Sequence, residues 1–575
     1  MRYSIAMSSR RAWLAVLAAA ILVVACAGVT PQASTPPTGE ATTSAGGASP
    51  SAATCEPPAA DVSAAGWWRD RVFYEVFVRS FADSDGDGIG DLRGLTAHLD
   101  DLNDGDPSTT DDLGVTGLWL MPIAESPSYH GYDVVDYRAV ERDYGTLEDL
   151  EALVAAAHAR GIAVILDLVV NHTSREHPWF QEARTPGSAH DGWYRWADER
   201  PAVARSDGSR VWHPDGDRFY YGYFWEGMPD LNLGNPDVTA ELDAIADFWL
   251  DLGIDGFRID AARHLFEDDK TLENVPETFA WLAGYRQRIK AEHPDALILG
   301  EVWDASSMAA RYVRDGALDL TFDFGLASAI LTSVRGGAGG TVDAAIGEVA
   351  ELYAPGALAT FLTNHDQKRA MTEFGGDLAA AKLAATLLLT GGGTPFVYYG
   401  EEIGLTGQKP DERIRTPMRW DASSPAAGFS TGTPWEPLGD DPPGTDVATE
   451  RADPDSLWST YRDLIALRDG EPALRSGSLV PVRVGDDALV AFLRAAPDPA
   501  DGAVLVVANL SDATVPAVPL ALEDGPLCGM IRAESLRGAR AVAPPAVTAS
   551  GGFEDYTPVA DGLGPREVLV VGLRR

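Results

Sequence analysis

Eight short apolar segments recur along this chain, and stretches with helical spacing separate them. The helical stretches include 147–160, 238–252 and 278–292. Strand–helix alternation repeated eight times is typical of an α/β fold in which parallel strands close into a (β/α)8 TIM barrel. Such a barrel places its active site at the C-terminal ends of the strands. The candidate strands are 72–78, 115–121, 162–169, 254–259, 296–300, 318–323, 358–363 and 395–399.

The connection after the third candidate strand is much longer than the others. It runs to about residue 235 and is rich in Trp, Tyr, His, Gly and Asp. A connection of this length inside a compact domain is usually functional. We therefore predict a small inserted domain over 171–235, which leaves 67–170 and 236–472 for the barrel.

The last part of the chain has a different pattern. A helical stretch at 457–468 is expected to end the barrel, and apolar residues then alternate with a period of two. This alternation predicts a separate C-terminal antiparallel β-sandwich domain over 473–575. Its candidate strands are 479–484, 488–494, 503–510 and 566–573.

Three carboxylates lie at or near the ends of the barrel's apolar segments. Asp260 ends Gly-Phe-Arg-Ile-Asp, Glu301 follows Ile-Leu-Gly, and Asp366 ends Thr-Asn-His-Asp. A carboxylate at the end of a buried strand is costly unless it is paired or used. Because parallel strands end on the same face of a barrel, we expect the three side chains to converge there. Two carboxylates that flank one bond are the groups that hydrolyse glycosides.

Composition limits the partners of the chain. Its 575 residues, 45% of them hydrophobic, suffice for two or three domains with cores of their own. It has 86 acidic and 45 basic residues, a formal net charge of -41. This balance argues against binding nucleic acid or an anionic membrane through a basic patch. We interpret the charge as the solvated surface of an extracellular protein.

The N-terminus has the pattern of an export signal. Basic residues precede an apolar run at 12–25, which is too short for a comfortable membrane span. The run ends at Val-Val-Ala-Cys, which resembles a bacterial lipoprotein signal with Cys26 as the acylated residue. We predict a signal peptide over 1–25, a flexible linker over 26–66 and an extracellular protein held to the membrane only by lipidated Cys26. The alternative is an ordinary signal peptide that contains a cysteine.

Two further cysteines, Cys55 and Cys528, remain after Cys26. In an exported chain they can pair, which would tie the linker to the C-terminal domain. Two free thiols are the alternative.

Five short motifs in this order resemble the α-amylase family, glycoside hydrolase family 13. The resemblance covers about 67–575, and the combination is far more specific than any single motif. The motifs are Asp-Leu-Val-Val-Asn-His at 167–172, Met-Pro-Asp-Leu-Asn at 228–232, Gly-Phe-Arg-Ile-Asp-Ala-Ala-Arg-His at 256–264, Glu-Val-Trp at 301–303 and Asn-His-Asp at 364–366.

The resemblance gives each acid a role. It implies that Asp260 is the nucleophile, that Glu301 is the general acid and then the general base, and that Asp366 grips the sugar and stabilises the transition state. Arg258 lies two residues before Asp260 on the same strand face, so we expect its charge to keep Asp260 ionised. Neighbouring carboxylates and a partly dry cleft would raise the pKa of Glu301, as a general acid requires.

The same resemblance implies the residues that bind substrate. His172 and His365 would donate hydrogen bonds to the reactive sugar, and Tyr132 would stack beneath it. Arg263 stands where Lys is commoner and would, with His264, contact the sugar beyond the cleavage point. The alternative for Tyr132 is an ordinary packed tyrosine.

A first calcium site is expected between residues 83 and 91. Acids alternate with other residues in Asp-Ser-Asp-Gly-Asp-Gly-Ile-Gly-Asp, as in the first half of a calcium loop. The twelfth position is Gly94 rather than Glu, so the loop is not an EF-hand. The alternative is a polar turn. The expected ligands are Asp83, Asp85, Asp87, the carbonyl of Ile89, and Asp91.

A second calcium site rests on the resemblance. Asn171, Asp230 and the carbonyl of His264 match the ligands that fasten the inserted domain to the barrel in α-amylases. Asn171 and Asp230 bracket the predicted insert, which suits a structural ion. We expect Ca²⁺ at one or both sites and no other cofactor.

Features of several branches of the family occur together. The segments at 171–174, 177–180 and 415–420 look like oligo-1,6-glucosidases and trehalose synthases, whereas Ala-Ala-Arg-His after Asp260 is an amylase feature. The Met-Pro-Asp-Leu-Asn segment is typical of the subfamily intermediate between oligo-1,6-glucosidases and neopullulanases.

These features predict an enzyme that cleaves internal α-1,4-glucosidic bonds in starch and maltodextrins, with transglycosylation as a side activity. The substrate partner is an α-glucan or maltooligosaccharide, and we expect a monomer. An exo-acting α-glucosidase or oligo-1,6-glucosidase is one alternative. A non-catalytic glycan-binding relative is another, although such proteins lose one or more of the three acids, and all three are present.

Overall fold

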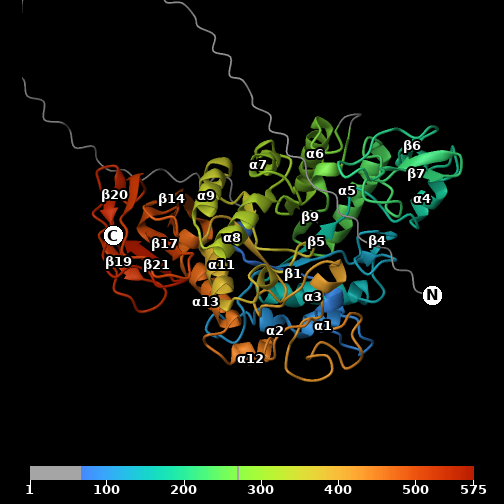
Figure 1. The fold of residues 1–575 in the computed structure, drawn as a ribbon. Coiled ribbons are helices and arrows are strands. Elements are labelled where there is room, and N and C mark those ends of the chain that lie inside the picture. Colours follow the sequence, from blue (N-terminus) through green and yellow to red (C-terminus); the bar gives the residue numbers. More distant parts are fainter. Residues whose placement is uncertain (1–65, 268–270) are drawn as a thin grey trace, which may run out of the picture. The chain divides into compact units, whose positions relative to one another are not determined.

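Eight parallel strands form a closed barrel in the computed structural model, which describes residues 66–267 and 271–575. The predicted (β/α)8 architecture is confirmed, and Figure 1 shows helices around the strands. In spatial order the strands are β1 (Phe73–Val76), β13 (Thr394–Tyr398), β12 (Leu358–Thr360), β11 (Leu320–Phe322), β10 (Leu297–Gly300), β9 (Gly256–Ile259), β5 (Ala163–Leu168) and β2 (Gly117–Leu120). Residues 1–65, with the predicted signal peptide, Cys26 and Cys55, lie outside the described residues.

Side chains fill the interior of the barrel. Phe73 stacks on Phe396 with ring centroids 4.6 Å apart, and Trp119 packs against Phe322. Successive side chains of a strand point to opposite faces, so the residues between these aromatics pack outward against helices. The barrel is therefore a packed core rather than a pore.

The helices that accompany the barrel follow from local signals. Thr146 and Asp149 form a capping box at the start of α3 (Leu147–Ala159), and Asn235 caps α5 (Pro236–Asp251) with Pro at its first position. The others are α1 (Leu92–Ala97), α2 (Leu99–Leu102), α6 (Pro276–Glu292), α7 (Ser306–Arg314), α8 (Phe324–Gly336), α9 (Gly340–Leu352), α10 (Ala370–Glu373), α11 (Leu378–Thr390), α12 (Val447–Arg451), α13 (Leu457–Gly470) and α14 (Pro472–Ser476).

The segment between β5 and α5 has its own small sheet. It carries α4 (Pro178–Ala183) and a three-stranded sheet of β6 (Trp196–Ala197), β8 (Arg218–Tyr221) and β7 (Trp212–Asp215). An isolated bridge pairs His172 with Asp230 near the two ends of the segment. Figure 1 shows β6, β7 and α4 together on one side of the barrel. A separate hairpin of β3 (Ala124–Glu125) and β4 (Asp136–Val140) precedes α3.

The C-terminal domain consists of two antiparallel sheets. Each of the four predicted runs contains a strand, but the run at 479–484 divides into two strands of different sheets, and three further strands complete the sheets. One sheet has the order β14 (Ser478–Pro481), β16 (Leu489–Ala495), β17 (Ala503–Asn509), β21 (Val568–Arg574) and β19 (Arg532–Ser535). The other has the order β15 (Arg483–Val484), β18 (Leu520–Asp524) and β20 (Gly551–Tyr556).

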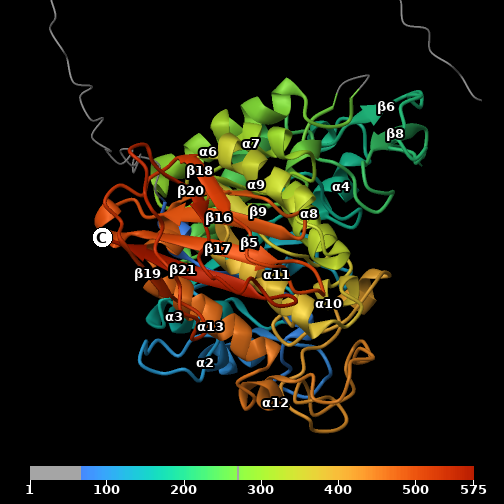
Figure 2. The same ribbon diagram turned by 60° about the vertical axis from the view of Figure 1, so that its left-hand side comes forward.

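The larger of these sheets is buried on both faces. Val490 and Phe492 of β16 join the core shared with the barrel helices, whereas Leu489, Ala491 and Leu493 pack toward the smaller sheet. Alternate residues of β16 therefore pack into two different hydrophobic cores, one on each face of the sheet. Contacts from β14 and β16 reach α9; Figure 1 shows β14 near α9, and Figure 2 shows β16 near it.

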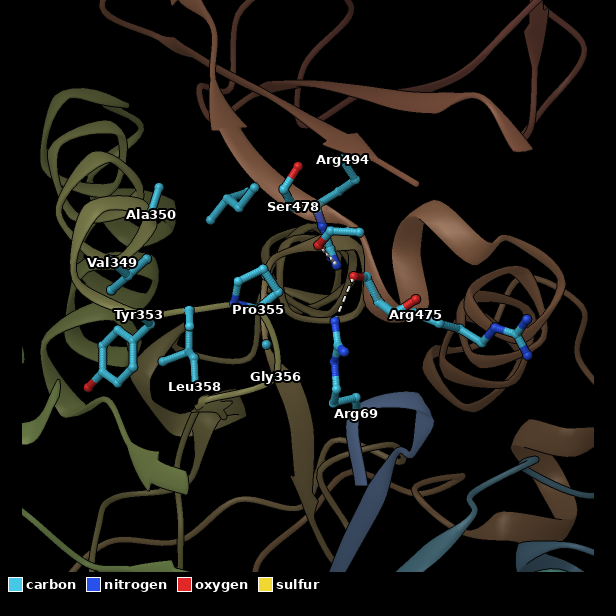
Figure 3. Close-up of a pocket in the computed structure, with 16 residues that line it drawn as sticks. Arg69, Val349, Ala350, Tyr353, Pro355, Gly356, Leu358, Arg475, Ser478 and Arg494 are labelled. Carbon is cyan, nitrogen blue, oxygen red and sulfur yellow. Dashed lines mark hydrogen bonds between the residues drawn. The ribbon is translucent and has the colours of Figure 1, made fainter. Parts of the chain in front are cut away.

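Buried arginines join the barrel to the C-terminal domain. Arg494 of β16 donates to the carbonyls of Thr390 and Gly391 at the end of α11, and Arg468 of α13 donates to that of Arg475 in α14. Arg69 donates to Ser476 at the end of α14. Cations are favourable at helix C-termini, where carbonyls lack partners. Figure 3 shows Arg69 and Arg494 at the cavity of about 130 Å³ between them.

Two observations bear on the export predictions. Cys528 is disulfide-bonded, which excludes a free thiol at that position, and its expected partner Cys55 lies outside the described residues. Within 66–267 and 271–575, no helix is both long and apolar enough to cross a membrane.

Candidate active site

One buried guanidinium contacts both of the carboxylates predicted to carry the chemistry. Asp260 follows β9 and Glu301 follows β10. The Nη1 atom of Arg258 lies 2.7 Å from Oδ1 of Asp260, and its Nη2 atom lies 2.9 Å from Oε2 of Glu301. Arg258 is 1% exposed, so these ion pairs lie within the protein rather than in solvent. The carboxyl ends of neighbouring strands thus converge as expected.

A third carboxylate completes the surroundings of Arg258. Asp167 is the register partner of Arg258 across β5 and β9, and its Oδ1 lies 2.7 Å from Nη1. The hydroxyl of Tyr132 donates to the other oxygen of Asp167 at 2.8 Å. Burial raises the pKa of Asp167 to about 7, with Arg258 opposing the rise. Arg258 therefore serves three carboxylates at once.

Asp366 is held by two basic groups. Its Oδ1 lies 2.9 Å from Nη2 of Arg415, and its Oδ2 lies 3.3 Å from Nε2 of His365. Burial would raise the pKa of Asp366, but the charges of His365 and Arg415 outweigh burial and lower it to about 2. Asp366 is therefore ionised at any pH near neutrality.

The pKa values of the acids near Arg258 shift in the opposite direction from the pKa of Asp366. Burial, with the negative charges of Asp260 and Asp366, raises the pKa of Glu301 despite the opposing charge of Arg258. This direction suits a general acid. Burial also raises the pKa of Asp260, against Arg258. The sequence placed Arg258 correctly, but its charge offsets only part of the cost of burying Asp260.

Ala261 links Asp260 and Glu301 through the backbone. Its φ is 49°, in the left-handed region that non-glycine residues rarely adopt, and its N–H donates to Oε2 of Glu301 at 3.0 Å. Such strain is typical of functional sites. The turn leads into the short 3-10 helix Ala262–His264, which carries two of the predicted substrate contacts.

The predicted substrate residues fall into two groups. Tyr132 stacks near His365, and its hydroxyl lies 2.7 Å from Nε2 of that histidine, so both belong to the acid cluster. Arg263 faces away toward Glu273 and Asp304, at 3.4 and 3.5 Å, and its Nε donates to His264. Arg263 and His264 therefore form a second patch beside the acids.

His172 carries a free polar atom. It is 1% exposed, and its Nε2 has no hydrogen-bond partner among the described residues. Burial lowers the pKa of His172 to about 4, so the ring is neutral near pH 7. An unpaired buried nitrogen is costly, and a sugar hydroxyl would satisfy it.

The loop at 83–91 gathers carboxylates as expected, but not all of them. Asp83, Asp85 and Asp91 offer oxygens within 4.8 Å of one another, a donor set of the kind that Ca²⁺ takes. Asp87 is not in this group, and its Oδ1 accepts the N–H of Ile89 instead. Ser430 donates to Asp83 from a distant part of the barrel domain.

Asn171 and Asp230 are both buried, at 1% and 3% exposure. Burial raises the pKa of Asp230 to about 7, while hydrogen bonds from the Tyr223 backbone and the Asn171 side chain favour its ionised form. Tyr223 also stacks on His264 with centroids 4.0 Å apart. The side chain of Asn171 thus faces Asp230 as a hydrogen-bond donor, and the second calcium site stays a prediction.

Comparison with known proteins decides the family. The model of the α-amylase catalytic domain matches residues 75–477. The chain belongs to the α-amylase family. "Alpha-amylase 3" of Dictyoglomus thermophilum is 40% identical over 452 residues, which cover 77% of this chain and 85% of that protein. A "Probable alpha-glucosidase" of Rhizobium meliloti is 34% identical, covering 74% of this chain and 87% of that one.

A solved structure supports the same assignment. The "alpha-amylase from H.orenii" is 39% identical to this α-amylase family member, with a TM-score of 0.74. The alignment covers 88% of this chain and all of that one. Both the barrel and the additional antiparallel sheets therefore follow the pattern of the family.

Three charged residues at the site of this family member were not singled out as site residues from sequence. They are Asp167, Arg415 and Glu75. Oε1 of Glu75 lies 2.5 Å from Nδ1 of His365. Asp167 and Arg415 stand inside motifs that the sequence displays. Glu75 had a weaker signal, which is one charged residue in the middle of an apolar strand segment.

Proposed function

We propose that this protein is a retaining glycoside hydrolase that cleaves α-1,4-glucosidic bonds in starch and maltodextrins. The observation that carries the proposal is the contact of one buried Arg258 with both Asp260 and Glu301. Two carboxyl groups held by the same guanidinium lie close enough to act on one bond. Retention needs them about 5–5.5 Å apart.

The reaction has two steps on these residues. Asp260 attacks the anomeric carbon while Glu301 gives its proton to the leaving oxygen, and a covalent glycosyl-enzyme forms. Glu301, now ionised, takes a proton from water as the water attacks the same carbon and frees Asp260. A sugar hydroxyl in place of water gives transglycosylation.

The remaining residues bind and orient the sugar. Asp366, ionised by its basic neighbours, accepts hydrogen bonds from sugar hydroxyls as positive charge develops at the anomeric carbon. His172 donates or accepts at its unpartnered Nε2, and Tyr132 offers its ring. Arg263 and His264 contact the leaving part of the glucan.

Calcium has a structural part in this proposal. Asp83, Asp85 and Asp91 would hold one ion, and Asn171, Asp230 and the carbonyl of His264 would hold another between the insert and the barrel. The close carboxylate oxygens of Asp83, Asp85 and Asp91 support the first assignment, and the burial of Asn171 and Asp230 supports the second. No step of the reaction needs the metal.

We also propose that the protein is exported and is attached to the membrane through Cys26. The sequence pattern at its N-terminus supports this placement. The disulfide at Cys528 agrees with an oxidising compartment. A monomer acting on α-glucan outside the cell is the simplest form of the proposal.

A second function is an exo-acting α-glucosidase or oligo-1,6-glucosidase. The relative from Rhizobium meliloti, with its printed description as a probable alpha-glucosidase, favours this alternative. The non-catalytic reading is disfavoured because Asp260, Glu301 and Asp366 are all present and gathered around His365 and Arg258.

The test is a product time course on soluble starch and on a maltoheptaoside blocked at its non-reducing end. Endo action predicts cleavage of the blocked substrate with mixed short products early. Glucose from unblocked substrate alone would establish the exo alternative. Activity in Asp260→Asn equal to wild type, or no cleavage of either substrate, would overturn the hydrolase proposal.

A further inference from the structure

A carboxylate lies inside the barrel beneath the acid cluster. Glu75 is the third residue of β1, between Trp119 of β2 and Tyr398 of β13 in the strand register. Alternation places Phe73 and Glu75 on the interior face, and Phe73 is indeed stacked in the barrel core. Glu75 is 2% exposed. A carboxylate so deeply buried needs a partner.

Its partner is His365. Oε1 of Glu75 lies 2.5 Å from Nδ1 of His365, which is fully buried. On the other side of the ring, Nε2 lies 2.7 Å from the hydroxyl of Tyr132 and 3.3 Å from Oδ2 of Asp366. Both nitrogens of His365 therefore face oxygen atoms.

The donors in this chain can be assigned from chemistry. An ionised Glu75 only accepts, so Nδ1 of His365 carries a hydrogen. The hydroxyl of Tyr132 donates to Asp167, so its oxygen is left to accept from Nε2. The ionised carboxylate of Asp366 also lies 3.3 Å from Nε2. With a hydrogen on each nitrogen, His365 is an imidazolium.

Other charged groups around His365 do not change this assignment. Arg415 opposes a positive ring, but its Nε donates to the backbone carbonyl of His365 and its guanidinium is paired with Asp366. Arg258 is paired with carboxylates of its own. The titratable and charged groups that face or act on the ring are Glu75, Tyr132, Asp167, Asp260, Asp366, Arg258 and Arg415.

We propose that Glu75 is a positioning residue that keeps His365 an imidazolium, and thereby fixes Asp366 and Tyr132 in place for the sugar. The expected effect of Glu75 on turnover rests on the proposed hydrolase function, whereas its expected effect on the protonation of His365 does not. Glu75 touches neither substrate nor a reacting atom. The charges of Asp366 and Glu75 together outweigh burial and raise the pKa of His365, in agreement with this role.

The first test is the protonation of His365 itself. Histidine-selective ¹⁵N NMR of the full exported chain, with the His365 signals assigned through His365→Gln, reports whether both ring nitrogens are protonated at pH 7. We expect an imidazolium in the wild type and a neutral ring in Glu75→Gln. An imidazolium that persists in Glu75→Gln, or a neutral ring in the wild type, overturns the proposal. This readout needs no activity.

The second test is the pH profile on maltoheptaoside. Removing the charge of Glu75 lowers the pH at which His365 loses its proton, so the alkaline limb of kcat/KM, which the deprotonation of Glu301 and of His365 together define, should move to lower pH. We expect kcat at pH 7 to fall by up to about 10²-fold, as for other groups that hold a catalytic residue in place, with a smaller change in KM. Glu75→Asp keeps the charge and should keep the wild-type profile.

Glu402→Gln is the matched control. Glu402 is equally buried, and it accepts from Tyr74 on the opposite face of β1. Its pH profile should match the wild type. A profile in Glu75→Gln that matches Glu402→Gln would mean that Glu75 is only structural. If Glu75→Gln does not fold, a neutral His365 in Glu75→Asp would overturn the proposal. An inactive wild type would instead refute the hydrolase function and leave the NMR test standing.

Discussion

The Nη2 atom of Arg258 lies 2.9 Å from Oε2 of Glu301, so the group that must carry a proton touches a permanent cation. The cation alone would lower the pKa of Glu301. Burial and the negative charges of the nearby carboxylates outweigh this cation, so the pKa of Glu301 is raised. The raised pKa of Glu301 favours the protonated form that a general acid needs.

Glu301→Gln should lower kcat on maltooligosaccharides by about 10²–10⁴-fold, because it removes general acid–base catalysis. In the wild type, activity should fall as pH rises through the raised pKa of Glu301, above the ordinary range of a glutamate. Steady-state kinetics on maltoheptaoside and on a maltosyl fluoride measure both. The fluoride needs no protonation, so its glycosylation step should be affected far less. An equal loss of kcat/KM, which reports the glycosylation step, on both substrates contradicts the role of Glu301.

Asp260→Asn should abolish turnover and yet stabilise the fold near neutral pH. Burial raises the pKa of Asp260 in the folded state. For a raised carboxyl, stability is fully present below the unfolded pKa and is lost as pH rises through the folded pKa. The neutral amide avoids that loss. Melting temperatures at pH 4 and pH 7 should show a larger gain at pH 7, and a uniform gain would refute the explanation.

Arg258→Leu should destabilise the protein by about 3–5 kcal/mol, because it leaves buried carboxylates without their cation. Asp167, Asp260 and Glu301 all lie within 3 Å of its guanidinium. Urea unfolding gives the free energy. Arg335→Leu, which breaks a surface pair with Glu373, should cost less than about 1 kcal/mol. Similar costs for the two variants would argue that the Arg258 pairs contribute little.

Removal of calcium should lower the melting temperature and leave the chemistry of the acids intact. Calcium at a hundredfold excess over its Kd stabilises by about 2.7 kcal/mol for one site. Calorimetry in Ca²⁺ and in EGTA measures the shift. Asp230→Asn should reduce the response, whereas Asp315→Asn should not. No change with EGTA in the wild type would dismiss both sites.

The barrel could be predicted because its strands are continuous apolar runs. Each of the eight runs contains a strand, and the acids at their ends do converge. Two of the missed strands of the C-terminal domain lack this signal: β19 has no fully buried residue, and β20 begins with two glycines. Glycine is depleted in strands, so the sequence there did not indicate one.

The partners within the site could not be predicted in the same way. Asp167 meets Arg258 because β5 and β9 are in that register, and register is set by the closed sheet rather than by either segment. Glu75 meets His365 across 290 positions of sequence. The sequence marked the reacting acids by motif, whereas the groups that set their protonation emerged only from the fold.

The arginine contacts at the end of α11 bear on how this protein can be engineered. A catalytic barrel cut after Ser476 would lose Arg494 and would expose the apolar face that Val490 and Phe492 cover. The two-sided burial of the larger sheet means that a foreign domain grafted in its place would need matching side chains on that face. The C-terminal sheets are therefore part of the folding unit of the enzyme. Domain exchange between relatives should succeed only when the barrel and the C-terminal sheets are transferred together.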